Sequence, residues 1–464
     1  MNVFRAFCLA SVLFVLAAGA HAAGVSLPAH ERVELANGTV LLLSEKHDVP
    51  LIGLEATVRG GAVSDPDGLD GMAGLLSELM QHGAGKRDAA AFAEAVAAVG
   101  GELSASAGLE GIYVSADFMA KDAELMIELV ADLLQRPLLA VDEFTKLRDR
   151  SINLIKAAKG ADPGELLPAY GNGFLFGKHA YGNPVGGSES TLANITHERL
   201  QQYYEEQVGG DRLIISVVGN FNTVALKARL TKAFGDWRAA TMPLPALTAA
   251  DKQTGRRVLL IDKPGATQSY FWIGNIGIAA NYPKRADLDL ANTVFGGRFT
   301  SMLNTEMRVK AGLTYGARSI LRRPTQPGTV VISSSTETGT TVEAIDLALK
   351  VLARLRDSGI NEDTLISARN YIMGQFPPRL ETAPQLAAQF AMLEQYGLDV
   401  AYINDYAAAL SAATSDSVTA AINEVYPSPE NLSFIVIGDA ALIREDISQY
   451  GAISEISIDE PRFR

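Results

Sequence analysis

The segment 71–82, Gly-Met-Ala-Gly-Leu-Leu-Ser-Glu-Leu-Met-Gln-His, has the spacing of a helical metal site without its ligands. Its large apolar residues recur at helical offsets, which predicts a helix with one buried face. Gly74, Ser77 and Glu78 fall on another stripe, at the spacing with which helical metallopeptidases aim two His ligands and an acidic base at zinc. Pairing Glu78 with His82 would still lack a third ligand and a base, and the two residues also fit a solvated helix end.

Length and charge limit what the chain can be. Its 464 residues and 48% apolar content predict a globular protein with at least two domains. The formal net charge is −13, which disfavours nucleic acid and anionic lipid as partners because both carry negative charge. We therefore expect no nucleic-acid partner.

The first residues have the pattern of a secretory leader. Residues 1–22 contain Arg5, an apolar run from Phe7 to Ala18, and the small-x-small sequence Ala20-His21-Ala22. The apolar run is shorter than the roughly 20 residues of a membrane-spanning helix, so we favour a cleaved signal peptide over an uncleaved anchor. The expected destination is the periplasm or another exported compartment, without stable membrane insertion. The only cysteine, Cys8, lies in this leader, so we expect no disulfide or cysteine nucleophile in the mature chain.

The rest of the chain is predicted to form two α+β units. The first covers 23–240, a Pro-containing linker follows at 241–257, and the second covers 258–464. Predicted strands of the first unit lie at 32–44, 51–58, 103–107, 112–118 and 213–218, and helices at 71–82, 88–99, 122–134, 141–158 and 196–207. Predicted strands of the second unit lie at 258–262, 269–274, 313–321, 329–336 and 433–437, and helices at 287–295, 342–357, 362–375, 384–396 and 415–425.

The two units are similar in sequence. A shift of about 219 residues places 141–143 on 360–362 and 217–219 on 436–438, a period far longer than that of a solenoid repeat. Two similar domains joined by a linker commonly form a cleft between them. The segment 170–187 is rich in Gly and Pro, and the next predicted helix begins only after it, at about Thr196.

Several short motifs occur in a fixed order along the chain. They are Gly60-Gly61 with Asp65, Gly71-Met72-Ala73-Gly74-Leu75-Leu76, Gly177-Lys178-His179-Ala180-Tyr181-Gly182-Asn183-Pro184, Val217-Val218-Gly219-Asn220, and Gly296-Gly297-Arg298-Phe299-Thr300-Ser301-Met302-Leu303-Asn304-Thr305-Glu306-Met307-Arg308 followed by Gly312-Leu313-Thr314-Tyr315. In this order they resemble the pitrilysin/insulinase family of zinc peptidases, in its short form related to mitochondrial processing peptidase. The resemblance implies an α+β fold of two homologous domains, each a mixed β-sheet with helices packed on one side, forming half of a clamshell that closes on unfolded peptides.

The resemblance also implies that the zinc site of this chain is degenerate. The family's motif is His-x-x-Glu-His, and its three functional positions fall on Gly74, Ser77 and Glu78. The third ligand, a Glu in a later helix, would fall near Leu154 or Ile155, where no carboxylate occurs. A catalytic zinc needs about three protein ligands, so we expect this chain to bind no metal.

The second unit matches the family more closely. In the family, an Arg and a Tyr within Arg-x-x-x-Gly-Leu-x-Tyr reach the bound peptide, and Arg308 and Tyr315 match them. An Arg offers a fixed fork of donors to a peptide carbonyl, and a Tyr hydroxyl can donate to a developing oxyanion. Without the resemblance, Arg308 would be read as a charge near a helix C-terminus and Tyr315 as a packed strand residue. By resemblance, the strand containing 333–336 could pair with an extended peptide.

These observations support one main hypothesis and two alternatives. The main one is a zinc-less subunit of an exported heterodimeric peptidase, inactive alone, whose paralogous partner carries His-x-x-Glu-His and zinc. The first alternative is a catalytically inactive structural or chaperone-like subunit of a periplasmic complex. The second is a homodimeric, metal-independent peptide-binding protein.

Overall fold

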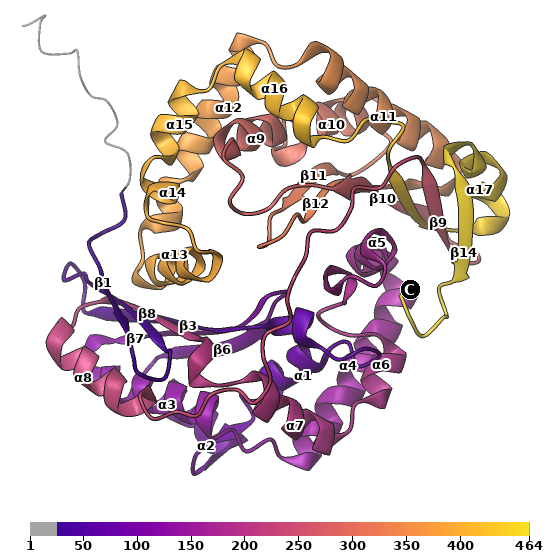
Figure 1. Ribbon diagram of the computed structural model, residues 1–464. Coiled ribbons are helices and arrows are strands. Elements are labelled where there is room, and N and C mark those ends of the chain that lie inside the picture. The colour runs from indigo at the N-terminus through magenta and orange to yellow at the C-terminus, as the bar shows by residue number, and fades with distance from the viewer. Residues whose placement is uncertain (1–25, 464) are drawn as a thin grey trace, which may run out of the picture.

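The chain folds into two halves, each built on a six-stranded sheet (Figure 1). The structure is a computed structural model that describes residues 26–463. The predicted leader at 1–22, with Cys8, lies outside the described residues. No helix among residues 26–463 is long and apolar enough to span a membrane.

The first sheet has the strand order β1-β2-β8-β3-β7-β6. Its strands are β1 (Glu31–Glu34), β2 (Val40–Glu45), β3 (Leu51–Arg59), β6 (Glu102–Ala107), β7 (Gly111–Met119) and β8 (Leu213–Gly219). Strand β8 pairs parallel with β2 and antiparallel with β3, so the sheet is mixed. Every residue of β8 is buried, because both faces of the sheet are covered at its centre.

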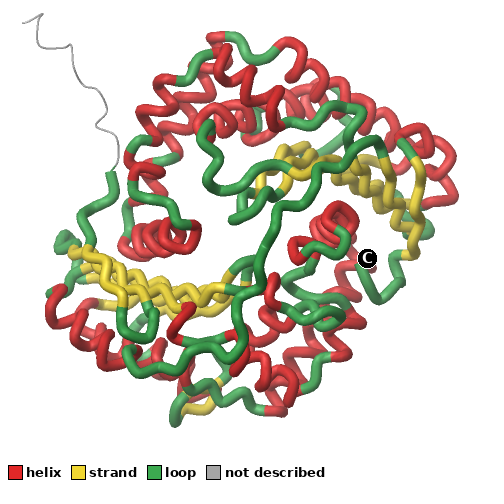
Figure 2. Tube along the Cα trace, viewed as in Figure 1, coloured by secondary structure: helices red, strands yellow, loops and turns green. Residues whose placement is uncertain are grey.

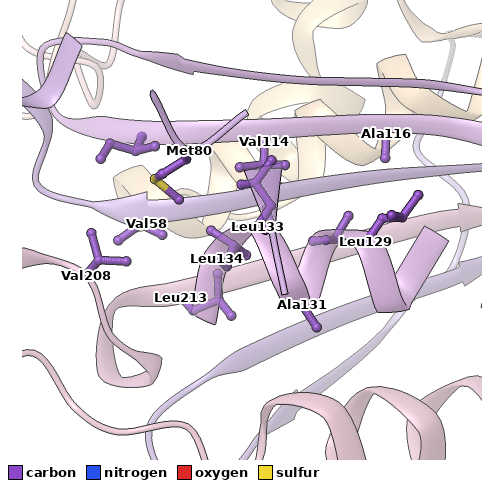
Figure 3. Close-up of a cluster of buried hydrophobic side chains, with 14 of the residues drawn as sticks. Val58, Met80, Val114, Ala116, Leu129, Ala131, Leu133, Leu134, Val208 and Leu213 are labelled. Carbon is purple, nitrogen blue, oxygen red and sulfur yellow. The ribbon is translucent and has the colours of Figure 1, made fainter. Parts of the chain in front are cut away.

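Eight helices belong to the described part of the first half. They are α1 (Met72–Leu79), α2 (Ala89–Ala97), α3 (Ala123–Gln135), α4 (Val141–Ala161), α5 (Leu167–Phe176), α6 (Glu189–Asn194), α7 (His197–Gln207) and α8 (Thr223–Phe234), with a small hairpin of β4 (Gly83–Ala84) and β5 (Arg87–Asp88) after α1. Leu129 and Leu133 of α3 meet Val58 and Val114 of the sheet in the core between them (Figure 3). The apolar face of α3, which repeats every 3.6 residues, thus packs on the alternate residues of the strands that point toward it.

The second sheet has the order β11-β12-β10-β13-β9-β14. Its strands are β9 (Arg257–Asp262), β10 (Gln268–Ile276), β11 (Ala317–Arg322), β12 (Thr329–Glu337), β13 (Ser433–Gly438) and β14 (Ala452–Ser457). Its helices are α9 (Arg285–Asn292), α10 (Met302–Asn304), α11 (Thr341–Ser358), α12 (Glu362–Gln375), α13 (Ala383–Tyr396), α14 (Ala401–Asn404), α15 (Tyr406–Ala412), α16 (Ser415–Val425) and α17 (Ala440–Ile447).

The two sheets repeat one topology, which confirms the predicted pair of similar α+β units. The order β2-β8-β3-β7-β6 matches β9-β13-β10-β12-β11 strand for strand. The pairing directions match as well: β2–β8 and β9–β13 are parallel, and the corresponding remaining pairs are antiparallel. Only the outermost strands differ, because β1 runs antiparallel to β2 whereas β14 runs parallel to β9.

Each half places one helix on the sheet of the other half (Figure 2). Helix α5 packs on β10 and β13, where its Tyr170 joins Trp272 in a buried cluster. Helix α13 packs on β3 and β8, where its Phe390 joins Ile214. The prediction of a mixed sheet with helices packed on one side is confirmed for each half's own helices, and a helix from the other half covers part of the second face.

Several predicted elements differ from the structure. The predicted strand 32–44 is a hairpin of β1 and β2, because Gly38, with φ of 89°, turns the chain. The predicted strand 313–321 begins only at Ala317, so Tyr315 precedes β11. Helix α5 overlaps the start of the Gly- and Pro-rich segment 170–187, where no helix was predicted. Gly171 lets it approach the Trp272 ring, since a Cβ on Gly171 would lie 2.9 Å from that ring. Helices α8 and α17 and strand β14 were not predicted at all.

Candidate functional site

Helix α1 is held in place by a buried carboxylate at its N-terminus. Asp65 Oδ2 accepts a hydrogen bond from the Gly71 amide at 2.8 Å, and Oδ1 accepts one from Ala73 at 3.0 Å. The Tyr203 hydroxyl donates to Oδ1 at 2.9 Å. Burial raises the pKa of Asp65 to about 7, against the opposing effect of these hydrogen bonds. The carboxylate satisfies amides that a helix leaves unpaired at its start, so the position of α1 is well defined.

The three zinc-motif positions make ordinary structural contacts. A Cβ built on Gly74 would lie 2.5 Å from the carbonyl oxygen of Val185, so the backbone of another segment covers this position. The buried Ser77 hydroxyl donates to the Gly74 carbonyl at 2.9 Å. Glu78 pairs with Arg150 of α4 at 3.4 Å, with both side chains substantially exposed. Gly74 has no side chain, and Ser77 and Glu78 are engaged by other groups, so these three positions form no metal-ligand set.

The other residues considered as metal ligands are also engaged elsewhere. His82 Nδ1 lies 2.7 Å from Glu143 Oε2, and Lys146, followed by His82, lowers the pKa of Glu143. Leu154 is 59% exposed, whereas Ile155 is partly buried against the core. Within residues 26–463, no group of three His, Cys, Asp or Glu side chains is placed to hold a metal ion. The donor set of the first half does not fit zinc.

Arg308 and Tyr315 meet at a hollow in the second half. The hollow has a volume of about 520 Å³ and is lined by Gln268, Arg308, Gly312, Leu313, Thr314, Tyr315, Ser335, Thr336, Glu337 and Thr340. Arg308 lies in the short π-helix Thr305–Lys310, and its guanidinium stands 5.0 Å from the centre of the Phe299 ring. Tyr315 is 87% exposed. Neither polar end group forms a hydrogen bond or an ion pair with a residue that the structure describes.

The hollow exists because β12 is longer than its neighbour β11. Strand β10 pairs with β12 along its whole length, whereas β11 pairs only with 329–334. The Ser334 hydroxyl donates to Thr314 Oγ1 at 3.1 Å and to the Gly316 carbonyl at 3.0 Å, which attaches the loop before β11 to β12 at this residue. The loop carrying Tyr315 therefore leaves residues 335–337 without a β11 partner.

The predicted site residues thus divide between two places. Arg308, Tyr315 and Thr336 line one hollow, while Gly74 and its neighbours belong to the other half. Sequence reasoning did not find Gln268 or Thr340, which also line the hollow, because polar strand and turn residues carry no motif. Gln268 can be assigned to the hollow only from the strand pairing, which places it opposite Glu337. No sequence pattern predicted the contact between Val185 and Gly74 either.

Two family models match the chain. The model described as insulinase (peptidase family M16) matches residues 40–169, and the one described as peptidase M16 inactive domain matches residues 194–372. An uncharacterized zinc protease of Streptomyces coelicolor is 25% identical over 81% of this chain and 82% of its own length. A Helicobacter pylori protein named non-peptidase homolog YmxG is 22% identical over 76% of this chain and 81% of its own length.

Solved structures share the fold. A crystal structure titled peptidase M16 inactive domain from Pseudomonas fluorescens has a TM-score of 0.81 at 20% identity, covering 88% of this chain and 98% of that one. The periplasmic protease PqqL from Escherichia coli has a TM-score of 0.74 at 16% identity, covering 89% of this chain and 46% of that one. These likenesses extend over both halves and confirm the predicted α+β fold of two sheet-containing domains.

Proposed function

The chain belongs to the insulinase family, peptidase family M16, and on this premise we propose that it is the zinc-less subunit of an exported, heterodimeric peptidase that cleaves unfolded peptides. A paralogous partner with an intact His-x-x-Glu-His motif would hold zinc and the general base. This chain would contribute Arg308 and Tyr315. One observation carries the proposal: these two side chains share an open hollow with unused donors, whereas the described part of the first half offers no metal ligand set.

The chemistry of the pair suits a polarised peptide carbonyl. The Arg308 guanidinium is a planar fork of donors, and the Phe299 ring beside it restricts its orientation. The Tyr315 hydroxyl can donate to an oxygen that gains negative charge in the transition state. Loss of one such donor typically lowers kcat by about 10²–10³-fold. Zinc, held by the partner, would supply the activated water.

The lining of the hollow also suits an extended peptide backbone. Residues 335–337 continue β12 beyond the end of β11, so their edge is available for strand addition. Polar groups of Gln268 and Thr340 lie beside this edge. Main-chain pairing depends little on side-chain identity, so this mode of binding accepts many unfolded sequences.

The test compares this chain, the paralogue with the zinc motif, and their mixture for zinc content and for cleavage of an unfolded peptide. We expect zinc in the paralogue and activity only in the mixture. Arg308→Ala should lower kcat of the mixture by about 10²-fold or more without changing assembly. Arg379→Ala is the matched control, because Arg379 is an exposed arginine outside the hollow. Full activity of the Arg308→Ala complex would refute the split-site proposal.

An alternative proposal is a catalytically inactive structural or peptide-binding subunit of a periplasmic complex. The absence of a three-residue ligand group within 26–463 favours it, and one relative is itself named a non-peptidase homolog. Under this alternative, the chain binds unfolded peptide without the zinc-bearing paralogue, and no mixture of the two gains cleavage. Peptide binding by this chain with zinc-independent affinity would support it.

A further inference from the structure

We infer that the metal position of the first half is closed by a backbone segment, so that restoring the missing ligands would not restore zinc binding. The closing segment, here termed the plug loop, is residues 183–187, Asn-Pro-Val-Gly-Gly. The plug loop and α1 both belong to this chain's first half, so the closure does not depend on a zinc-bearing partner.

The plug loop touches α1 backbone to backbone through glycines. A Cβ on Gly74 would lie 2.5 Å from the Val185 carbonyl oxygen, and one on Gly71 would lie 2.7 Å from the Gly187 Cα atom. From the other side, a Cβ on Gly187 would lie 2.5 Å from the Asp70 carbonyl oxygen. Each distance is too short for a side chain, and each obstacle is backbone. A His at position 74 therefore has no room for even its first side-chain atom.

The plug loop is anchored on both sides of this contact. The Asn183 amide group donates to the Ala62 carbonyl at 3.1 Å, and the Gly187 amide donates to the Pro184 carbonyl at 2.9 Å. Immediately after the loop, Ser188 caps helix α6: its amide donates to Thr191 Oγ1 at 2.8 Å. The first of these bonds ties the plug loop to the segment before α1, and the other two fix the shape of the loop and of the turn into α6.

The strand edge next to α1 is also occupied. Gln81 Nε2 donates to the Ser77 carbonyl at 3.0 Å and to the Ala105 carbonyl of β6 at 2.8 Å. Strand β6 is the outermost strand of the first sheet, and a carbonyl on such an edge is what an added peptide strand would use. The first half is thus closed where a metal would bind, and one carbonyl of the neighbouring edge already has a partner, whereas the second half is open at Arg308 and Tyr315.

The first experiment restores the family's ligands. The fourfold variant Gly74→His, Ser77→Glu, Glu78→His, Ile155→Glu is equilibrated with zinc chloride, desalted and analysed for bound metal beside the wild-type chain. We expect both proteins to bind far less than one zinc ion per chain. One zinc ion per chain in the folded variant would overturn the inference.

A second experiment remains informative if the fourfold variant fails to fold. Gly74→Ala adds a single Cβ against the plug loop and should lower Tm, because the Val185 carbonyl must move. Gly374→Ala is the matched control: Gly374 is also helical, and an added Cβ there has nothing within 4 Å. The control should leave Tm unchanged or raise it, since Ala favours helix over Gly. If Gly74→Ala is as stable as Gly374→Ala, the position is not closed and the inference fails.

Discussion

Glu55 is a carboxyl group buried on the face of the first sheet that helix α13 partly covers. It lies on β3 between Ser115 and Ser216 of the adjacent strands, and it accepts a hydrogen bond from the Ser115 hydroxyl at 2.6 Å. Burial raises the pKa of Glu55 to about 7, and the hydrogen bond only partly opposes this shift. The folded protein therefore keeps this proton up to a pH at which the unfolded chain has lost it.

This shift predicts a pH dependence of stability. Between about pH 4.5 and 7, the folded state binds one more proton at Glu55 than the unfolded state, so the free energy of unfolding falls as pH rises. Glu55→Gln removes this contribution. The free energy of unfolding of the variant minus that of wild type should be roughly 1–3 kcal/mol more positive at pH 8 than at pH 5. Urea unfolding of both proteins at the two pH values checks this, and an equal difference at both would contradict it.

At the same scale, the sequence predicts that Arg308 and Tyr315 lie close together, but it does not show which residues surround them. Arg308 and Tyr315 are seven residues apart, so a local motif brings them together and sequence alone could identify them. Gly74 could be recognised as a missing ligand, but not as a contact of Val185. That contact joins segments far apart in the chain, and a glycine required for close approach is indistinguishable in sequence from one in an open position.

At the scale of elements, helix α13 is fitted closely to the first sheet. A Cβ on Gly53 of β3 would lie 2.5 Å from the backbone nitrogen of Pro384, at the start of α13. At the other end of the helix, Glu394 pairs with Arg32 at 2.9 Å and with Arg59 at 3.6 Å. The helix is therefore held to β1 and β3 by charge and lies against the sheet with no space for an added methyl group.

Gly53→Ala should consequently destabilise the protein. Overpacking of a tight contact typically costs about 1–3 kcal/mol, and here the obstacle is backbone that belongs to the other half. Chemical denaturation measures the loss. Gly339→Ala, where an added Cβ has nothing within 4 Å, serves as the control and should stay within about 0.5 kcal/mol of wild type. Equal stabilities for the two variants would show that α13 can shift without cost.

Elements that depend on local pattern were predicted, and those that depend on the other half were not. The amphipathic helices α3, α7, α11 and α16 were found from their periodicity. Helix α5 was missed because its glycines lower helix propensity, and its stability comes from packing on the second sheet. The late start of β11 depends on hydrogen bonds between Ser334 and the loop before it, which sequence does not reveal.

At the scale of the whole molecule, the exchange of α5 and α13 makes each half incomplete without the other. The sheet of the second half buries Trp272, Ile435 and Ile437 under α5 of the first. The C-terminal segment adds a further tie: Phe463 packs edge-on against Tyr170 at 4.9 Å, and the Glu460 carbonyl accepts a hydrogen bond from Lys159. Separation of the halves would expose these apolar surfaces to water, which costs about 25 cal/mol of free energy per Å² of apolar surface.

The connection between the halves should therefore be dispensable once the chain has folded. Residues 241–246 are exposed and contain no helix or strand. A specific protease site inserted between Leu244 and Pro245 allows the folded chain to be cut there. We expect the two fragments to elute together in gel filtration, since α5 and α13 still bridge them. By contrast, a fragment ending at residue 244 and produced alone should aggregate, because the apolar face of α5 and the uncovered face of its sheet would be exposed. Separate elution of the cut fragments would mean that the linker, and not the exchanged helices, holds the halves together.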